Sequence, residues 1–199
     1  AGVGKEVVAR LIHRKSKRAA DPFVILNAAS ISAAQVDKEL FGSSEGNAGT
    51  AGLLERANGG TLYIDGVTDL PLPAQSRLLR ALQDQAFERP GSGQLVKMDV
   101  RVISSSTHDL KAAITEGKLR EDLFYRLNVV PIRVPSLSER KEDIPLLCEN
   151  LMKRSAKLLG LPAKVLHEDA IAVLQSYDWP GNVRQLKNVL EWLLIMTQG

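Results

Sequence analysis

The order of its secondary-structure patterns constrains this chain more than any other feature of the sequence. Up to about residue 135, short apolar runs typical of strands alternate with amphipathic helical patterns, and only helical patterns follow. Strands that alternate with helices predict a mostly parallel sheet covered by helices on both faces. We therefore expect an α/β domain over residues 1–137, followed by a small helical domain over residues 138–199.

The predicted strands are short and rich in β-branched residues. They read FVILN, TLYID, VRVISSS and VVPIRV, at residues 23–27, 61–65, 100–106 and 129–134. A hairpin is expected around Pro90 and Gly91. The first helix is expected over residues 5–18, because its apolar side chains recur on one helical face.

Composition narrows the class of protein. The chain has 199 residues, of which 44% are hydrophobic and 25% charged, as in ordinary globular domains. No apolar run approaches the ~20 residues of a membrane-spanning helix, and the first residues lack the pattern of a signal peptide. Cys148 is the single cysteine, so an internal disulfide is excluded. We expect a cytoplasmic protein with no membrane partner, in which Cys148 is a small buried side chain.

Charge and histidine content favour neither a nucleic-acid surface nor a metal site in this chain. The net charge is +3, and the densest basic run is RKSKR at residues 14–18. This run lacks interleaved aromatic residues, so we interpret it as a solvated helix end. The histidines, His13, His108 and His167, are scattered and lack cysteine partners, so we expect no metal site built on them.

Glycines open the first predicted helix. Backbone N–H groups of such a turn point at a phosphate, the helix dipole favours an anion there, and a lysine can reach the outer phosphates. The pattern G-x-x-x-x-G-K-[ST] is incomplete, because its first glycine would precede residue 1 and a glutamate replaces the hydroxyl residue; we expect the natural protein to be longer. The alternative is a surface lysine at a helix start. The candidate nucleotide-binding residues are Gly2, Val3, Gly4, Lys5 and Glu6.

The strand TLYID ends in an acidic residue. Parallel-sheet enzymes carry functional groups at the carboxyl ends of strands, and a carboxylate there can hold Mg²⁺ beside a nucleotide. Asp65 is therefore the candidate magnesium ligand, and the alternative is that it only caps the following turn. Together with Lys5, it favours a nucleotide-binding domain.

Five longer motifs give the chain a specific resemblance. They are ELFG, GGTLYID, GKLREDLFYRLNVVPIRVP, ERKEDIP and WPGNVRQLKN, in this order. In this combination the chain resembles, over essentially its whole length, the central AAA+ ATPase domain of sigma-54-dependent transcriptional activators, the NtrC family. The resemblance implies a P-loop AAA+ three-layer sandwich with a mostly parallel sheet, followed by a small C-terminal helical lid subdomain. A generic P-loop kinase or GTPase explains neither GKLREDLFYRLNVVPI nor the helical lid.

The resemblance also implies roles for single residues. Lys5 would contact the β- and γ-phosphates of ATP, and Asp65 would position Mg²⁺. Arg120 and Arg126 match the arginine fingers, which reach the nucleotide of a neighbouring subunit and stabilise charge on the transferred phosphoryl group. Their alternative is a pair of salt-bridged surface arginines. Arg184 matches the lid arginine that senses the γ-phosphate, and Trp179 before it is expected to be core packing.

The most consequential departure from the family follows Asp65. The family usually has Asp-Glu at this point, and the glutamate polarises the attacking water; here Gly66 stands in its place. A positioned general base is worth about 10²–10⁴-fold in rate, so we expect weakened hydrolysis. Asn27 matches the residue that restrains the missing glutamate. Asp69 lies nearby in sequence, but family members that keep the glutamate also have it.

Two further departures concern a loop and a sensor. The family's GAFTGA loop, which engages sigma-54, is replaced by SSEGNAGTAG at residues 43–52, so contact with RNA polymerase or its sigma factor is doubtful and we expect an ordinary flexible surface loop. Ser106 and Thr107 stand where the family usually has Thr-Asn, which makes Thr107 the expected sensor. A threonine hydroxyl can hydrogen-bond a phosphate or a water but lacks the reach of an amide.

Two functions stay open at this point. One is a nucleotide-responsive oligomerisation module of a two-component response regulator, in which ATP sets the assembly state. The other is an active ATPase that remodels the sigma-54 RNA polymerase holoenzyme. Both imply ATP and Mg²⁺ as cofactors, a homo-oligomer (a ring or a dimer), and contact with DNA through a domain absent from this chain. Whether the chain is an enzyme is left open by Gly66.

Overall fold

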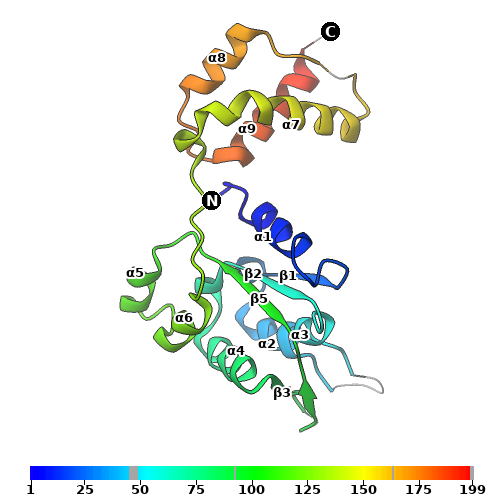
Figure 1. The fold of residues 1–199 in the computed structure, drawn as a ribbon, viewed down its shortest axis with the longest axis vertical. Helices are drawn as coiled ribbons and strands as arrows, with labels where there is room; N and C mark the ends of the chain where they lie inside the picture. Colours follow the sequence, from blue (N-terminus) through cyan, green and yellow to red (C-terminus); the bar gives the residue numbers. More distant parts are fainter. Residues whose placement is uncertain (45–48, 92, 163, 198–199) are drawn as a thin grey trace. The chain divides into compact units, whose positions relative to one another are not determined.

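The computed structural model describes residues 1–44, 49–91, 93–162 and 164–197. It divides into two compact units (Figure 1). The sheet unit is Glu6–Pro131, and the helical unit comprises Ala1–Lys5 and Ile132–Gly199. The division therefore comes earlier in the chain than the predicted boundary between 137 and 138, which stays a prediction.

Three parallel strands form the centre of the sheet unit. They are β1 (Phe23–Asn27), β2 (Thr61–Asp65) and β5 (Arg101–Ser105), in the order β1-β2-β5. The register aligns their last residues, since Asn27 pairs with Asp65 and Asp65 with Ser105. The carboxyl ends of all three strands therefore meet at one edge of the sheet.

The side chains of β2 alternate between two helical layers. Leu62 and Ile64 are buried in the main core with residues of α2, α3 and α4. Tyr63 points to the other face of the sheet, where its ring stacks on that of Phe23. On the same face, Oγ1 of Thr61 is hydrogen-bonded to Nδ1 of His13 in α1 at 3.0 Å. The sheet thus lies between α1 and the group α2–α4 (Figure 1), which is the three-layer α/β arrangement that was expected.

The remaining elements of the sheet unit surround this sandwich. The α-helices are α1 (Lys5–Arg14), α2 (Ala33–Phe41), α3 (Leu53–Arg56), α4 (Leu72–Asp84), α5 (Leu110–Thr115) and α6 (Glu121–Leu127). The short 3-10 helices are η1 (Ala28–Ser30) and η2 (Val67–Asp69). The predicted hairpin is present as β3 (Ala86–Glu88) and β4 (Leu95–Lys97), which pair antiparallel.

Two predictions about elements are wrong. The segment 129–134, expected as a strand, is not one, because Val129 and Val130 are each 76% exposed and no described strand lies beside them to complete a ladder. The first helix ends at Arg14 rather than at residue 18. The basic run after it folds back, and Arg18 bonds Asp99 at 2.6 Å and the carbonyl of Gly59 at 2.9 Å.

The helical unit contains α7 (Ile144–Leu159), α8 (Glu168–Ser176) and α9 (Asn182–Met196), preceded by η3 (Leu137–Glu139) and η4 (Lys141–Asp143). Helices α7 and α9 pack around a second apolar core that includes Cys148 and Trp179. Burial raises the pKa of the Cys148 thiol to about 11, so it acts as a small apolar side chain, as predicted. Trp179 is 3% exposed and donates its indole N–H to the Leu174 carbonyl at 2.6 Å.

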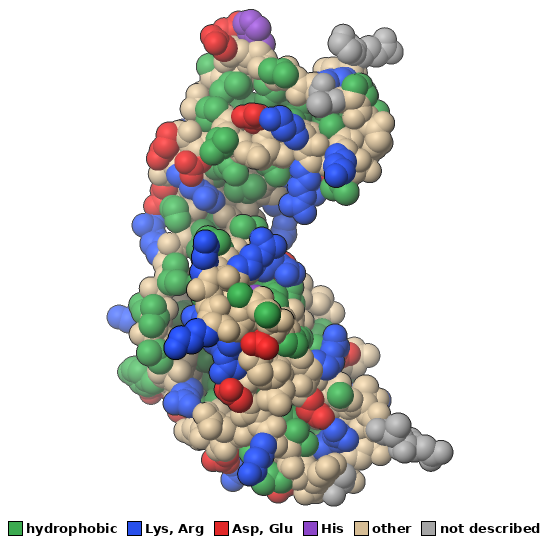
Figure 2. Space-filling view, turned by 45° about the vertical axis from the view of Figure 1, so that its right-hand side comes forward, with side chains coloured by type: hydrophobic (Ala, Val, Ile, Leu, Met, Phe, Trp, Pro, Cys, Tyr) green, Lys and Arg blue, Asp and Glu red, His purple; other side chains and the backbone are tan. Residues whose placement is uncertain are grey.

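The surface of both units is mixed in charge. In the view of Figure 2, Lys and Arg side chains are spread over the molecule and interspersed with Asp and Glu. Among the described residues, no helix is both long and apolar enough to cross a membrane.

Candidate functional site

The glycine turn at residues 1–4 belongs to the helical unit and lies against the start of α9. Gly2 has φ +74°, and a Cβ on it would lie 2.5 Å from the Gly181 carbonyl oxygen and 3.1 Å from Cβ of Arg184. A side chain at this position is therefore excluded by both conformation and space. Within the helical unit, the structure brings together two predicted site residues, Gly2 and Arg184.

Two hydrogen bonds hold the same turn. Asn182 donates its Nδ2 to the Ala1 carbonyl at 3.0 Å, and Arg140 donates Nη2 to the Val3 carbonyl at 2.7 Å. Asn182 is buried and also accepts the Leu137 N–H at 2.7 Å. These two bonds tie the turn to Arg140, which precedes η4, and to Asn182, the first residue of α9. Sequence reasoning missed Asn182 and Arg140, although both lie inside motifs that it had singled out.

The first helix begins at Lys5, as the glycine-turn interpretation requires. Gly4, before it, has φ +99° and open space around its Cα. Glu6 begins the sheet unit, and its carboxylate accepts from Arg10 at 2.8 Å, one helical turn later. Both partners are about half exposed, so this pair is a surface ion pair.

The carboxylate of Asp65 is oriented by two hydroxyl groups of the sheet. Ser105 of β5 donates to its Oδ1 at 2.6 Å, and Tyr63 of β2 donates to the same atom at 3.2 Å. Tyr63 also lies 3.1 Å from Ser105 Oγ. Burial raises the pKa of Tyr63 to about 12, so its hydroxyl remains a donor at neutral pH. The Asp65 oxygen Oδ2 receives neither bond, and a carboxylate fixed in this way suits a Mg²⁺ ligand.

Sequence reasoning placed Asn27 and Asp65 at the site and missed Tyr63 and Ser105. The structure aligns Asn27 with Asp65 across neighbouring strands. The signal for Tyr63 was its spacing, since residues two apart on a strand share a face. Ser105 was one of three consecutive serines, and only the register of β5 against β2 distinguishes it from the other two.

The residue after Asp65 has a backbone conformation that favours glycine. Gly66 has φ +82°, and its N–H donates to the Ser105 carbonyl at 3.1 Å. A Cβ at this position would lie 2.4 Å from Oδ2 of Asp69. The carboxylate of Asp69 therefore occupies the space into which a glutamate side chain at position 66 would start.

The predicted sensor, Thr107, is exposed and follows the end of β5. Its neighbours make the contacts instead. Thr68 of η2 lies 3.4 Å from Ser106 Oγ and 3.2 Å from His108 Nδ1, and Ser106 Oγ accepts the His108 N–H at 3.0 Å. Within the sheet unit, the segment after β5 is thus tied to η2 through Ser106 and His108, which sequence reasoning did not propose.

The two candidate arginine fingers lie on one short helix and are both exposed. Arg120 is the N-terminal cap residue of α6, and its guanidinium donates to both carboxylate oxygens of Asp122, at 3.0 and 2.7 Å. This ion pair raises the pKa of Arg120 and lowers that of Asp122. Arg126 donates Nη2 to the Leu82 carbonyl of α4 at 2.8 Å.

The loop that replaces the sigma-contact motif lies partly outside the described residues. Of SSEGNAGTAG, residues 45–48 are not described. On either side of them, Ser43 and Thr50 form an antiparallel bridge, with N–H to carbonyl distances of 3.0 and 2.8 Å. The described ends of the loop are therefore closed by backbone hydrogen bonds.

Known proteins match the whole length of the chain. The family of sigma-54 interaction domains matches residues 1–133, and that of AAA+ ATPase lid domains matches residues 138–199. The chain is 50% identical over 200 residues to the nitrogen assimilation regulatory protein NtrX of Azorhizobium caulinodans, covering 100% of the chain and 44% of that protein. It is 46% identical over 203 residues to the DNA-binding transcriptional regulator NtrC of Escherichia coli, covering 100% of the chain and 43% of that protein.

A solved structure is similar throughout. The crystal structure of NtrX from Brucella abortus in complex with ATP matches with a TM-score of 0.93 at 50% identity, over 100% of this chain and 44% of that one. The chain thus spans less than half the length of each of these relatives.

Proposed function

Because the chain belongs to the family of sigma-54 interaction domains and continues into an AAA+ lid, we propose that it is the ATP-binding part of a bacterial response regulator that controls nitrogen-related transcription. The chain is 50% identical to NtrX of Azorhizobium caulinodans and 46% identical to NtrC of Escherichia coli, and its motifs are similar to those of NtrX. In this proposal ATP sets the assembly state of the domain, and hydrolysis is weak. DNA is contacted by another part of the protein.

One observation carries the proposal of weak hydrolysis. Asp65 is held by Ser105 and Tyr63 as a metal ligand should be, yet Gly66 follows it with no side chain to polarise a water. Binding and catalysis therefore depend on different residues: the oriented carboxylate of Asp65 supports ATP·Mg²⁺ binding, whereas hydrolysis also needs a general base, which Gly66 cannot supply. A bound nucleotide would then persist and could act as a signal.

The donor set fits ATP and Mg²⁺. We assign the phosphates to the turn Gly2–Val3–Gly4 and to Lys5, where α1 begins, and the metal to Asp65, whose carboxylate Ser105 and Tyr63 orient. When bound, Mg²⁺ would neutralise charge on the β- and γ-phosphates. Arg184 would sense the γ-phosphate, Asn27 keeps the position that restrains the glutamate in the family, and Thr107 remains the proposed sensor. The relative from Brucella abortus was crystallised with ATP.

Assembly would depend on the arginines of α6. Arg120 and Arg126 are exposed on one helix, where a second copy of the chain can reach them. An arginine that contacts the phosphates of a neighbouring subunit couples nucleotide binding to subunit association. We therefore propose a homo-oligomer, a ring or a dimer, that forms on ATP.

A second function, an active ATPase that remodels sigma-54 RNA polymerase holoenzyme, is favoured by one contact. The carboxylate of Asp69 lies where a side chain of residue 66 would begin, so it is a candidate for the missing base. The loop over residues 43–52 lacks the phenylalanine of the family's sigma-contact motif, which disfavours this function.

The test is to measure ATP affinity by calorimetry and steady-state hydrolysis in one preparation of the whole protein, with Lys5→Ala as the control. The proposal expects tight Mg²⁺-dependent binding that Lys5→Ala abolishes, with turnover close to background. Rapid turnover that disappears in Lys5→Ala and in Asp69→Asn would establish the active ATPase instead.

A further inference from the structure

A buried glutamine of α4 makes three hydrogen bonds to backbone groups near the candidate arginines. Gln75 is fully buried, with 0% of its surface exposed. Its Nε2 donates to the carbonyls of Leu70 and Lys118, both at 2.8 Å. Its Oε1 accepts the N–H of Arg120 at 2.9 Å. One side chain thus joins the start of α4 to the two residues on either side of Leu119.

This pattern uses every strong hydrogen-bonding group of the amide. Two N–H groups and one carbonyl oxygen are satisfied, which a leucine, a methionine or an ionised glutamate cannot reproduce. A buried amide is costly unless it is bonded in this way. The glutamine therefore has a specific role in fixing the backbone from Lys118 to Arg120.

The bond to Arg120 determines where α6 begins. Arg120 is the N-terminal cap of α6, with extended φ −69° and ψ 133°, and it makes no side-chain cap hydrogen bond of its own. Its N–H is instead bonded to Gln75. A contact from another helix thus holds the backbone amide of the residue at the start of α6. Arg126 is tied to α4 as well, through the Leu82 carbonyl.

We propose that Gln75 is a positioning residue that holds the backbone of Arg120 so that its guanidinium can reach the nucleotide of a neighbouring subunit. This inference rests on the proposed function, in which Arg120 acts in trans. Helix α4 is then the platform for both arginines. Gln75 itself touches neither nucleotide nor reacting atoms.

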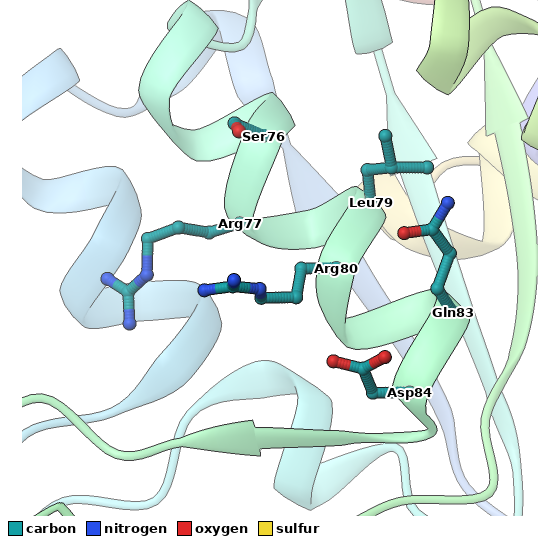
Figure 3. Close-up of a pocket in the computed structure, with 6 residues that line it drawn as sticks. All are labelled: Ser76, Arg77, Leu79, Arg80, Gln83 and Asp84. Atoms are coloured by element: carbon teal, nitrogen blue, oxygen red, sulfur yellow. The ribbon is translucent and has the colours of Figure 1, made fainter.

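The exposed side of the same helix offers a matched control. Figure 3 shows a hollow on this side, lined by Ser76, Arg77, Leu79, Arg80, Gln83 and Asp84. Gln83 is exposed there. Gln83→Met therefore replaces the same type of side chain on the same helix, at an exposed position that makes none of the side-chain hydrogen bonds described for α6.

The first experiment compares Gln75→Met with Gln83→Met in the whole protein. Thermal unfolding shows whether each variant is folded, and ATP affinity is measured at protein concentrations too low for assembly. The inference expects Gln75→Met to raise the protein concentration for half-maximal ATP-driven assembly about tenfold, in sedimentation velocity, with ATP affinity of the single subunit changed less than about twofold. Gln83→Met should match wild type in both.

A second variant keeps part of the contact. Gln75→Glu retains an oxygen that accepts the Arg120 N–H, and burial favours its neutral form, which donates one hydrogen bond where glutamine donates two. Among folded proteins, it should impair assembly less than Gln75→Met does. An equal or larger impairment in folded Gln75→Glu would overturn the inference, because the bond accepted from Arg120 would then not support assembly.

A mixing experiment separates positioning from a general structural defect. Gln75→Met subunits should keep a working nucleotide site and lack a well-placed arginine, whereas Lys5→Ala subunits lack nucleotide binding and keep the arginine. Mixed with ATP at a protein concentration below that at which Gln75→Met assembles alone, the two variants should assemble together. Failure to assemble in the mixture would overturn the inference.

The outcome also distinguishes this inference from the proposed function. If wild type does not assemble on ATP, or if Arg120→Ala assembles as wild type does, the proposed function fails. If Arg120→Ala abolishes assembly and folded Gln75→Met does not change it, the proposed function stands and the positioning role fails.

Discussion

Two regions of the sheet unit carry charged groups of the candidate site, and they are built differently. Asp65 lies at a strand end, where Tyr63 of the same strand and Ser105 of β5, 40 residues later, both donate to its carboxylate. Arg120 lies on an exposed helix and pairs with Asp122, only two residues later. The fold itself orients the first group, whereas a local ion pair holds the second.

This difference has a physical consequence. Hydrogen bonds to a charged group contribute about 1.5–3 kcal/mol each when they are well formed, while an exposed ion pair contributes about 0–1 kcal/mol. The Arg120–Asp122 pair is 41% and 46% exposed. Asp65 is therefore preorganised, whereas Arg120 can exchange Asp122 for another anionic partner at little cost. In the proposed function, that partner is a phosphate bound to another subunit.

The largest expected effect comes from restoring a glutamate after Asp65. Gly66→Glu alone should have little benefit, because a non-glycine residue at φ +82° costs about 1–3 kcal/mol and its Cβ meets Asp69. The double variant Gly66→Glu with Asp69→Ala should raise turnover by about 10²–10⁴-fold. The measurement is steady-state hydrolysis. A double variant as slow as wild type would show that a missing base does not limit the rate.

Loosening the Asp65 carboxylate should have the next largest effect. Ser105→Ala removes the 2.6 Å hydrogen bond to Asp65 and should weaken the affinity for Mg²⁺ by about 10–100-fold, as outer-shell partners of metal ligands typically do. A Mg²⁺ titration of ATP binding measures this. Ser104→Ala, on the opposite face of the same strand, is the control and should leave the titration unchanged. Equal affinities for the two variants would contradict the assigned role.

Alkaline pH should weaken the sheet unit through Tyr63. The pKa of Tyr63 is raised from 10.0 to about 12 in the folded protein, so the contribution to stability is complete below pH 10 and is lost as the pH rises towards 12. The free energy of unfolding should therefore fall between pH 10 and pH 12 more steeply in wild type than in Tyr63→Phe. If the free energy of unfolding fell with pH equally in wild type and in Tyr63→Phe, Tyr63 would have the same pKa in the folded and the unfolded protein.

The smallest effect is expected from a change in the Arg120–Asp122 ion pair. Asp122→Ala frees Arg120 and removes an exposed ion pair, so the free energy of unfolding should change by less than about 1 kcal/mol. ATP-driven assembly should need a lower protein concentration, by at most about fivefold. Loss of assembly in this variant would mean that Asp122 positions Arg120 rather than competing for it.

Local pattern was sufficient to predict β1, β2 and the place of Asp65, because β-branched runs with a terminal acid are a short-range signal. It was not sufficient for residues 129–134, since a strand also needs a partner and Val129 lies exposed with none described beside it. The role of Ser105 was missed for the same reason, because it depends on the register of β5 against β2, which no single run of residues specifies. Tyr63 lies two residues before Asp65 on the same strand, so its role could have been predicted from spacing alone.

The glycine after Asp65 was recognised from sequence as a departure, but its conformation was not. Only the structure gives the positive φ and the nearby Asp69 carboxylate, which change the expected result of Gly66→Glu. Gln75 lies outside the motifs that the sequence analysis identified, and nothing local distinguishes it from other helical glutamines. Its three backbone partners come from segments that the fold brings together.

The most direct test of the account is sedimentation velocity of the whole protein with and without ATP·Mg²⁺, for wild type and Arg120→Ala. The account predicts that wild type sediments faster when ATP is present, even where hydrolysis is close to background, and that Arg120→Ala binds ATP but sediments as it does without nucleotide. Sedimentation that ATP leaves unchanged in wild type, or changes equally in both proteins, would contradict it.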